Sequence, residues 1–156
     1  MIKTLNLVSK KQSKLINDFA SHWNKDFNGL QNFLSSFFNI YCSVDADIVR
    51  PYMEDWSNID GFADILVKPE SPIQCAIILK TAFFCKIPIT VSAGQTNLTG
   101  SATPKLGIVL STSLLTSPNI KIDKNKKEVI APVGLRLEDL RKEVLKQSNM
   151  QLFYPV

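Results

Sequence analysis

The chain has 156 residues, of which 45% are hydrophobic and 21% charged, and this fits one globular domain or one and a fraction. Its single histidine, His22, excludes a His-rich metal site, and a Ser-His-Asp triad would need His22 as its base. The three cysteines (Cys42, Cys75 and Cys85) form no CxxC pair, which predicts reduced thiols in a cytoplasmic protein. No apolar run approaches the roughly 18 residues of a membrane span, and the start lacks the apolar core of a signal peptide.

The formal charge of +4 is a mild excess of scattered lysines. The densest cluster, Lys121–Lys127, is expected at a solvated hairpin end, with a nucleic-acid or membrane patch as the alternative. The sequence has no basic stripe interleaved with aromatic residues, so we predict no nucleic-acid partner.

Residues 9–38 are predicted to be helical, because apolar side chains recur at spacings of three and four. We expect Asn28-Gly29 to divide this region into two helices. Residues 41–63 have no clear period and include Pro51 and Gly61, so they are predicted to form a long connection. The apolar stripe consists of Leu15, Phe19, Trp23, Phe27, Leu30, Phe33 or Leu34, and Phe37. It indicates core packing, with partner docking as the alternative.

From Asp64 onward the pattern is that of a βαβ unit. Asp64–Pro69 is a short apolar run that ends in proline, which predicts a buried strand. Ser71 is a good N-cap with Pro72 at the first helical position, and the helix that follows is apolar on most sides, so we expect it to be largely buried. Ile87–Val91 predicts the next strand, and such a unit favours parallel strands and a right-handed crossover.

The rest of the chain predicts further strands and one helix. Gly107–Thr112 is predicted to be a strand, and Asn119–Asp123 and Glu128–Val133 a hairpin. Residues 134–150 predict a helix with acidic residues early and lysines late, and Leu152–Val156 begins an extended segment. The predicted fold class is therefore α/β (α+β): a small, mostly parallel βαβ sheet plus a hairpin, flanked by helices.

The stretch "TVSAGQTNLTGSATPKLGIVL" (residues 90–110) lies between two predicted strands and holds three of the six glycines. It is no P-loop, because Gly94 and Gly100 are separated by five residues and Ser101 follows instead of lysine. Nor is it a GxGxxG fingerprint, because Pro104 and another strand follow instead of a helix. Two alternatives remain: an ordinary loop, or one whose backbone N–H groups bind a pyrophosphate, with small and hydroxylated residues allowing close approach.

The order of these elements resembles the first half of the FAD-binding domain of the FAD-linked oxidase family, which includes vanillyl-alcohol oxidase, glycolate oxidase and D-lactate dehydrogenase. The resemblance runs from about Asp64 to Tyr154. It rests on the strand that ends in proline, the segment "SAGQTNLTG", the strand "GIVL", the "NIKID" strand and "VGLRLEDL". Upstream, "RPYMEDWS" is similar to a "Y..D.S" leader that some members carry.

The resemblance implies that the loop wraps the FAD pyrophosphate, with hydroxyls from Thr96 and Thr99, and that Pro69 and Gly134 lie at turns near the flavin. The alternative for Pro69 and Gly134 is plain turn geometry. The implied cofactor-binding residues are Pro69, Ser92, Ala93, Gly94, Gln95, Thr96, Asn97, Leu98, Thr99, Gly100, Ser101 and Gly134.

The chain departs from the family pattern at the start of the loop. Many members have arginine and two or three glycines where this chain has "SAGQ" (residues 92–95), which removes a positive charge and places Gln95 where glycine is usual. We expect Gln95 to demand a negative φ more strongly than glycine does. Some members attach flavin through a loop histidine; this loop has none, so the resemblance implies non-covalent FAD.

The family's FAD domain continues beyond the length of this chain, and a substrate domain with the catalytic residues follows. We therefore expect an N-terminal piece, inactive alone, with residues 1–60 a helical extension and 61–156 the first half of an FAD-binding domain. The implied parent is a flavin-dependent oxidase or dehydrogenase, such as one for a 2-hydroxy acid. The alternative is a non-catalytic interaction or scaffold protein. Expected partners are FAD and the missing part or a partner subunit. A homo-oligomer that associates near Leu152–Val156 or through the parallel sheet is also expected.

Overall fold

The computed structural model describes residues 7–150 and residue 152. The chain divides into two compact units, one that ends at Ser111 and one that begins at Thr112. The predicted boundary between residues 60 and 61 separates a helical extension from an FAD-binding domain. The division into compact units does not test it, so it stays a prediction. Among the described residues, no helix has the length and apolar character needed to cross a membrane.

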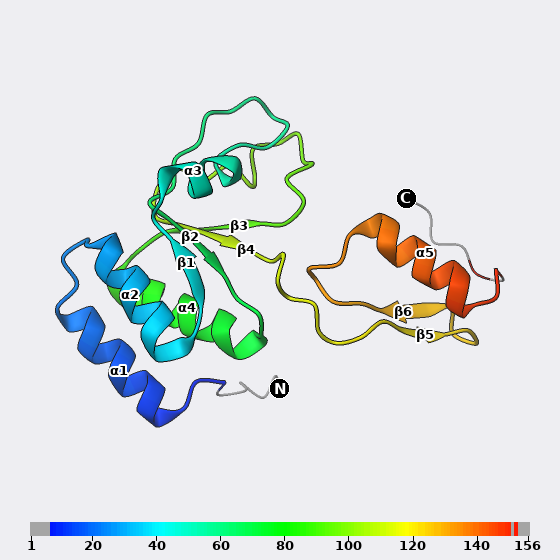
Figure 1. Ribbon diagram of the computed structural model, residues 1–156, viewed down its shortest axis with the longest axis horizontal. Coiled ribbons are helices and arrows are strands. Elements are labelled where there is room, and N and C mark those ends of the chain that lie inside the picture. The colour runs from blue at the N-terminus through cyan, green and yellow to red at the C-terminus, as the bar shows by residue number, and fades with distance from the viewer. Residues whose placement is uncertain (1–6, 151, 153–156) are drawn as a thin grey trace. The chain divides into compact units, whose positions relative to one another are not determined.

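The first unit is built on a four-stranded sheet of order β1-β2-β4-β3 (Figure 1). Strands β2 (Ile65–Lys68) and β3 (Ile89–Ser92) both pair in parallel with β4 (Ile108–Ser111), which lies between them. Strand β1 (Tyr41–Ser43) pairs antiparallel with β2. The predicted mixed α/β fold with mostly parallel strands is confirmed.

Helix α4 (Pro72–Cys85) connects β2 to β3 and begins as the sequence predicts, with the Ser71 side chain accepting a hydrogen bond from the Gln74 N–H. The expectation that this helix is largely buried is wrong for its outer side. Phe83 is 76% exposed and Leu79 is exposed as well, whereas Ile78 is fully buried. Only one side of α4 packs inward, so the remaining apolar residues stay on the surface.

Helices α1 (Lys10–Ser21) and α2 (Phe27–Phe38) form the predicted N-terminal helical region, but the break between them differs from the prediction. The chain turns within residues 22–26, where Lys25 has a positive φ of 70°. Gly29 lies inside α2 instead of ending a helix. Asn24 accepts a hydrogen bond from the Asp26 N–H through its side chain, and this local bond favours a turn over a continuous helix.

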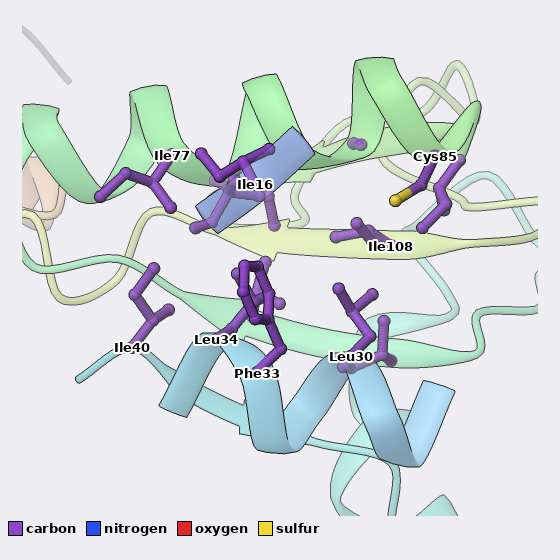
Figure 2. Packing of buried hydrophobic residues seen from close by; sticks show 14 residues of the cluster. Ile16, Leu30, Phe33, Leu34, Ile40, Ile77, Cys85 and Ile108 are labelled. Carbon is purple, nitrogen blue, oxygen red and sulfur yellow. The ribbon is translucent and has the colours of Figure 1, made fainter. Parts of the chain in front are cut away.

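The main core lies on the helical side of the sheet and contains side chains of α1, α2, α4 and the strands. Figure 2 shows Ile77 and Cys85 of α4 pointing toward Leu30 and Leu34 of α2. The apolar stripe of the N-terminal helices packs in or against this core, which confirms the core-packing interpretation for every member except Phe37, whose side chain is exposed. A second cluster, with Leu66 and Val109 among its members, covers the other face of the sheet, as is typical of parallel strands buried on both sides.

The predicted connection 41–63 contains more structure than its sequence indicates. It includes β1, the short helix α3 (Ala46–Val49) and the 3₁₀ helix η1 (Arg50–Tyr52). Strand β1 was missed because three residues are too few to establish a period of two. Its partner β2, 22 or more residues later in the sequence, determines its conformation.

The second unit contains the predicted hairpin and helix. Strands β5 (Lys121–Asp123) and β6 (Glu128–Ile130) pair antiparallel, and α5 (Leu137–Gln147) follows. The turn residues 124–127 are exposed, as expected for a solvated hairpin end. Most of Leu152–Val156, where self-association is expected, lies outside the described residues.

Candidate functional site

The glycine-rich loop, residues 93–107, joins β3 to β4. Because these strands are parallel, the loop must leave the carboxyl end of β3 and return to the amino end of β4. On its way it lies beside residues 51–64 (Figure 1), and the Phe62 N–H donates to the Pro104 carbonyl oxygen at 2.7 Å. Near its end, the Gly107 N–H donates to Asp64 Oδ2, also at 2.7 Å.

The first part of this loop leaves its backbone donors available. Within the part of the chain that the structure describes, none of the N–H groups from Ala93 to Ser101 donates a hydrogen bond to another protein group. Backbone N–H groups in folded proteins are almost always paired with protein or with water. A run of consecutive N–H groups without protein partners has the donors that a phosphate-binding loop requires.

The glycines of the loop divide into two kinds. A Cβ added to Gly94 would meet no atom closer than Thr96 Cγ2 at 4.0 Å, so the space beside this residue is open. In contrast, Gly100 and Gly107 have positive φ values of 72° and 79°, and a Cβ at Gly107 would lie 2.5 Å from the Pro88 carbonyl oxygen. Gly100 and Gly107 are thus required by the fold, whereas Gly94 is free to admit a ligand to the main chain.

Asp55 binds the loop from the neighbouring segment. Its Oδ2 atom accepts hydrogen bonds from Asn97 Nδ2 at 2.6 Å and from the Ala102 N–H at 3.3 Å, and its Oδ1 accepts from the Ser57 N–H at 2.9 Å. The pKa of Asp55 is lowered to about 2 although the residue is buried. The largest cause is the hydrogen bond from the Ser57 side chain, and hydrogen bonds from Asn97 and Ala102 contribute as well. The carboxylate is therefore ionised at neutral pH.

Gln95 forms a second connection to the same segment. Its Nε2 donates to the carbonyl oxygens of Pro51 and Glu54, at 2.8 and 2.6 Å. Its φ is +55°, contrary to the expectation that a non-glycine residue here would demand a negative value. The two side-chain hydrogen bonds offset the cost of the left-handed conformation, which therefore survives without glycine.

The remaining predicted residues lie as follows. Ser92 ends β3, is buried and is in register with Ser111 of β4, while Pro69 is buried directly after β2, at the same edge of the sheet. Leu98 is 72% exposed, and Thr96, Thr99 and Ser101 are exposed beside it.

Gly134 belongs to the other compact unit. Its N–H is already donated to the Leu115 carbonyl oxygen, and a Cβ there would lie within 3.0 Å of three carbonyl oxygens. This geometry fits a packed turn, so the role of Gly134 in cofactor binding stays a prediction.

Sequence reasoning overlooked two charged residues of the first unit, Asp55 and Lys68. Asp55 is the acidic residue of the "Y..D.S" leader, which gave no indication of its contacts with the loop. Lys68, the last residue of β2, places its ammonium 4.9 Å from the ring centre of Tyr52 and 5.5 Å from that of Tyr41. A lysine before Pro69 carries no sequence signal of this arrangement, because one ring comes from β1 and the other from η1.

The donor set fits a phosphate better than a metal. Among residues 7–150 and 152, no group of three or more His, Cys, Asp or Glu side chains is placed to hold a metal ion. Backbone N–H groups and hydroxyls, including the buried Thr103 Oγ1 that has no partner in the described chain, suit anionic oxygens. The residues present therefore fit the diphosphate of a dinucleotide cofactor.

Comparison with known proteins agrees with this geometry. A family model described as FAD binding domain matches residues 63–155. D-lactate dehydrogenase of Archaeoglobus fulgidus is 35% identical over 77 residues, which are 49% of this chain and 17% of that protein. The chain thus spans less than a fifth of the curated relative that it matches.

Solved structures share the fold. p-Cresol methylhydroxylase with substrate bound matches with a TM-score of 0.62 at 17% identity, over 92% of this chain and 26% of that one. 6-Hydroxy-D-nicotine oxidase of Arthrobacter nicotinovorans matches with a TM-score of 0.57 at 25% identity, over 69% of this chain and 23% of that one. Since the family model covers more than half of the sequence, the chain belongs to the FAD binding domain family of FAD-linked oxidases.

Proposed function

We propose that residues 92–101 hold the diphosphate of FAD in a flavin-dependent oxidoreductase that oxidises a small substrate such as a 2-hydroxy acid. The observation that supports this most is the run of unpaired N–H groups from Ala93 to Ser101, beside the open space at Gly94. Hydroxyls of Thr96, Thr99 and Ser101 would supply further donors. The 2-hydroxy acid rests on the similarity to a D-lactate dehydrogenase.

The cofactor itself would supply the redox chemistry by accepting a hydride equivalent. The residues of this chain would bind and orient the cofactor, and we assign no catalytic residue among them. We propose non-covalent attachment, because the loop contains no histidine or cysteine and His22, the only histidine of the sequence, lies at the end of α1. Pro69 at the carboxyl end of β2 would border the cofactor, as ligands in parallel sheets bind at this edge.

Activity would need more polypeptide than the 156 residues of this chain, either a further part of the same protein or a partner subunit. The chain covers only about a quarter of each solved relative, which supports this proposal. The exposed apolar residues of α4, such as Phe83 and Leu79, are a surface on which other polypeptide would pack, including a second copy. Three free cysteines support a location in the cytoplasm.

The decisive experiment is a titration of the purified chain with FAD, and with ADP as a second ligand, followed by flavin fluorescence and calorimetry. We expect saturable binding of both, because both carry the diphosphate that the loop would hold. In Gly94→Val, the added side chain would fill the open space and block the approach to the main chain, so binding of both ligands should fall by about tenfold or more.

Ser36→Val is a matched control, because it adds valine to an exposed position of α2, far from the loop in sequence. It should bind FAD as the natural chain does. If neither ligand binds to the natural chain, or if Gly94→Val binds both without loss, the loop is not the diphosphate site. Binding of neither ligand would favour the alternative, an interaction protein that keeps the fold alone.

A further inference from the structure

Asp55 holds two separate points of the glycine-rich loop with one carboxylate oxygen. Asn97 donates to Oδ2 from its side chain, and Ala102 donates to it from its backbone, just after the run of unpaired N–H groups. Asp55 is only 8% exposed, and its other oxygen is fixed by the Ser57 N–H. The carboxylate therefore joins the loop firmly to residues 55–57.

The loop is thus held mainly by side chains. Gln95 reaches the carbonyl oxygens of Pro51 and Glu54, and Asn97 reaches Asp55, while the backbone donors of the same residues stay unused. A loop that folded on itself would consume these donors in turns, since buried or crowded N–H groups otherwise stay unsatisfied. Fixing the loop through side chains leaves its N–H groups available to a ligand, and a loop that is already ordered lowers the ordering cost of binding.

The negative charge of Asp55 would oppose the binding of an anionic ligand to the loop. A carboxylate next to a diphosphate site repels the ligand and lowers its affinity if charge alone matters. No lysine or arginine of the described chain forms a salt bridge with Asp55. The carboxylate is compensated only by the hydrogen-bond donors of its own segment and of the loop. If the loop holds a diphosphate, the geometric contribution of Asp55 would have to exceed this electrostatic cost.

We propose that Asp55 is a positioning residue, which holds residues 95–102 in the conformation that presents their N–H groups to the diphosphate of the cofactor. This inference rests on the proposed function. It assigns a role to the segment before the sheet, outside the loop that binds the ligand. Asp55 would act through Asn97 and Ala102 and would not touch the cofactor.

The substitution Asp55→Asn separates geometry from charge, because the two predict opposite signs. Asparagine has nearly the same shape but only one acceptor oxygen, so its amide group faces donors that were bound to the carboxylate. If Asp55 positions the loop, ADP affinity falls by about tenfold or more, although a negative charge has been removed. If Asp55 acts only through its charge, ADP affinity rises.

Asp60→Asn is the matched control for charge, since Asp60 is exposed in the same segment and its carboxylate accepts no hydrogen bond in the described structure. We expect at most a small rise in ADP affinity. A loss in Asp60→Asn as large as that in Asp55→Asn would overturn the proposal, because any carboxylate of the segment would then have the same effect.

A ligand-free measurement tests the loop directly. The Ala102 N–H is bound to Asp55 and the Thr103 N–H to the Gly100 carbonyl oxygen, so both amides should exchange slowly with solvent deuterium in NMR. In Asp55→Asn both should exchange about tenfold faster or more, while the amides of α2 keep their rates. Unchanged exchange at Ala102 and Thr103 would overturn the positioning role. Absence of ADP binding in the natural chain would instead count against the proposed function alone.

A pair of compensating substitutions provides rescue. Asn97→Asp places two carboxylates within hydrogen-bonding distance, so it should accelerate exchange at Ala102 as Asp55→Asn does. In the double variant Asp55→Asn with Asn97→Asp, the amide and the carboxylate exchange places and their hydrogen bond can form again. We expect the exchange rate of the Thr103 N–H to be closer to that of the natural chain than in either single variant. The Ala102 N–H should still exchange fast, because an amide nitrogen would replace the oxygen to which it donates. Additive effects of the two changes would contradict a direct bond between these residues.

Discussion

The side-chain amide of Gln95 donates a hydrogen bond to the carbonyl oxygen of Glu54 at 2.6 Å, while the backbone of Gln95 is in the left-handed region. The same nitrogen also donates to the Pro51 carbonyl oxygen. A residue at a position suited to glycine is therefore retained by the contacts of its side chain. This balance between backbone strain and side-chain hydrogen bonds can be measured.

We predict that Gln95→Ala lowers the free energy of unfolding by about 1–3 kcal/mol, because two hydrogen bonds are lost and the strain remains. Gln95→Gly should lose less, by about 1 kcal/mol, because glycine adopts the positive φ without strain. Urea unfolding followed by circular dichroism provides both values. Equal losses in the two variants would show that strain at residue 95 is negligible.

Gly107 and Gly94 should respond differently to alanine. Gly107→Ala places a Cβ against the Pro88 carbonyl oxygen at a positive φ, and we expect a loss of about 1–3 kcal/mol in the free energy of unfolding. Gly94→Ala has open space around its Cβ and should leave stability within about 0.5 kcal/mol of the natural chain. Thermal unfolding of the two variants decides this, and a strongly destabilised Gly94→Ala would mean that this glycine serves the fold.

Phe33 and Phe37 test whether the N-terminal helices belong to the core. The Phe33 ring is 7% exposed and stacks on Phe19 with ring centres 4.1 Å apart, whereas Phe37 is 60% exposed. Phe33→Ala should cost about 3–5 kcal/mol through the cavity it leaves. The matched change Phe37→Ala should cost under about 1 kcal/mol. Similar losses in both variants, measured by urea unfolding, would contradict the packing seen in the structure.

The cysteine thiols should react slowly in the folded protein. Burial raises the pKa of Cys42 from 9.0 to about 12 and that of Cys85 to about 11, so neither forms much thiolate at pH 8. Reaction with Ellman's reagent at pH 8 should therefore be slow at these two positions and fast in urea. Rapid labelling of Cys42 in the folded chain would show that its environment opens.

The same shifts predict the effect of alkaline pH on stability. The pKa of these thiols is higher in the folded chain than in the unfolded one. The contribution of the protonated thiols to the free energy of unfolding is therefore fully present below about pH 9 and is lost as the pH rises from 9 toward 12. Replacing Cys42 by alanine should reduce this loss in unfolding experiments at pH 8 and pH 10.5.

Asp55 should produce the opposite dependence at acidic pH. Its pKa is lowered in the folded chain from 3.8 to about 2, so its contribution to stability is present above pH 3.8 and is lost as the pH falls through 2. The difference in unfolding free energy between the natural chain and Asp55→Asn should therefore be largest near neutral pH and small at pH 2. A carboxyl-carbon NMR titration of Asp55 measures the pKa itself, and a value near 4 would contradict this prediction.

Local patterns in the sequence were sufficient for several elements. Ser71 and Pro72 indicate the start of α4, the apolar runs indicate β2, β3 and β4, and the lysine-rich turn indicates the hairpin of β5 and β6. These signals are reliable because capping, burial and turn formation depend on residues close together in the chain. The glycine-rich loop is also recognisable, because three of the six glycines lie between two apolar runs that predict strands.

The sequence alone determined that the chain is mixed α/β with a glycine-rich loop between parallel strands. Only the tertiary structure decided how that loop is held. Strand β1, the inserted position of β4, and the contacts of Asp55 and Gln95 all join residues far apart in sequence. No local period records such contacts, because their energy comes from partners that meet only after the chain has folded.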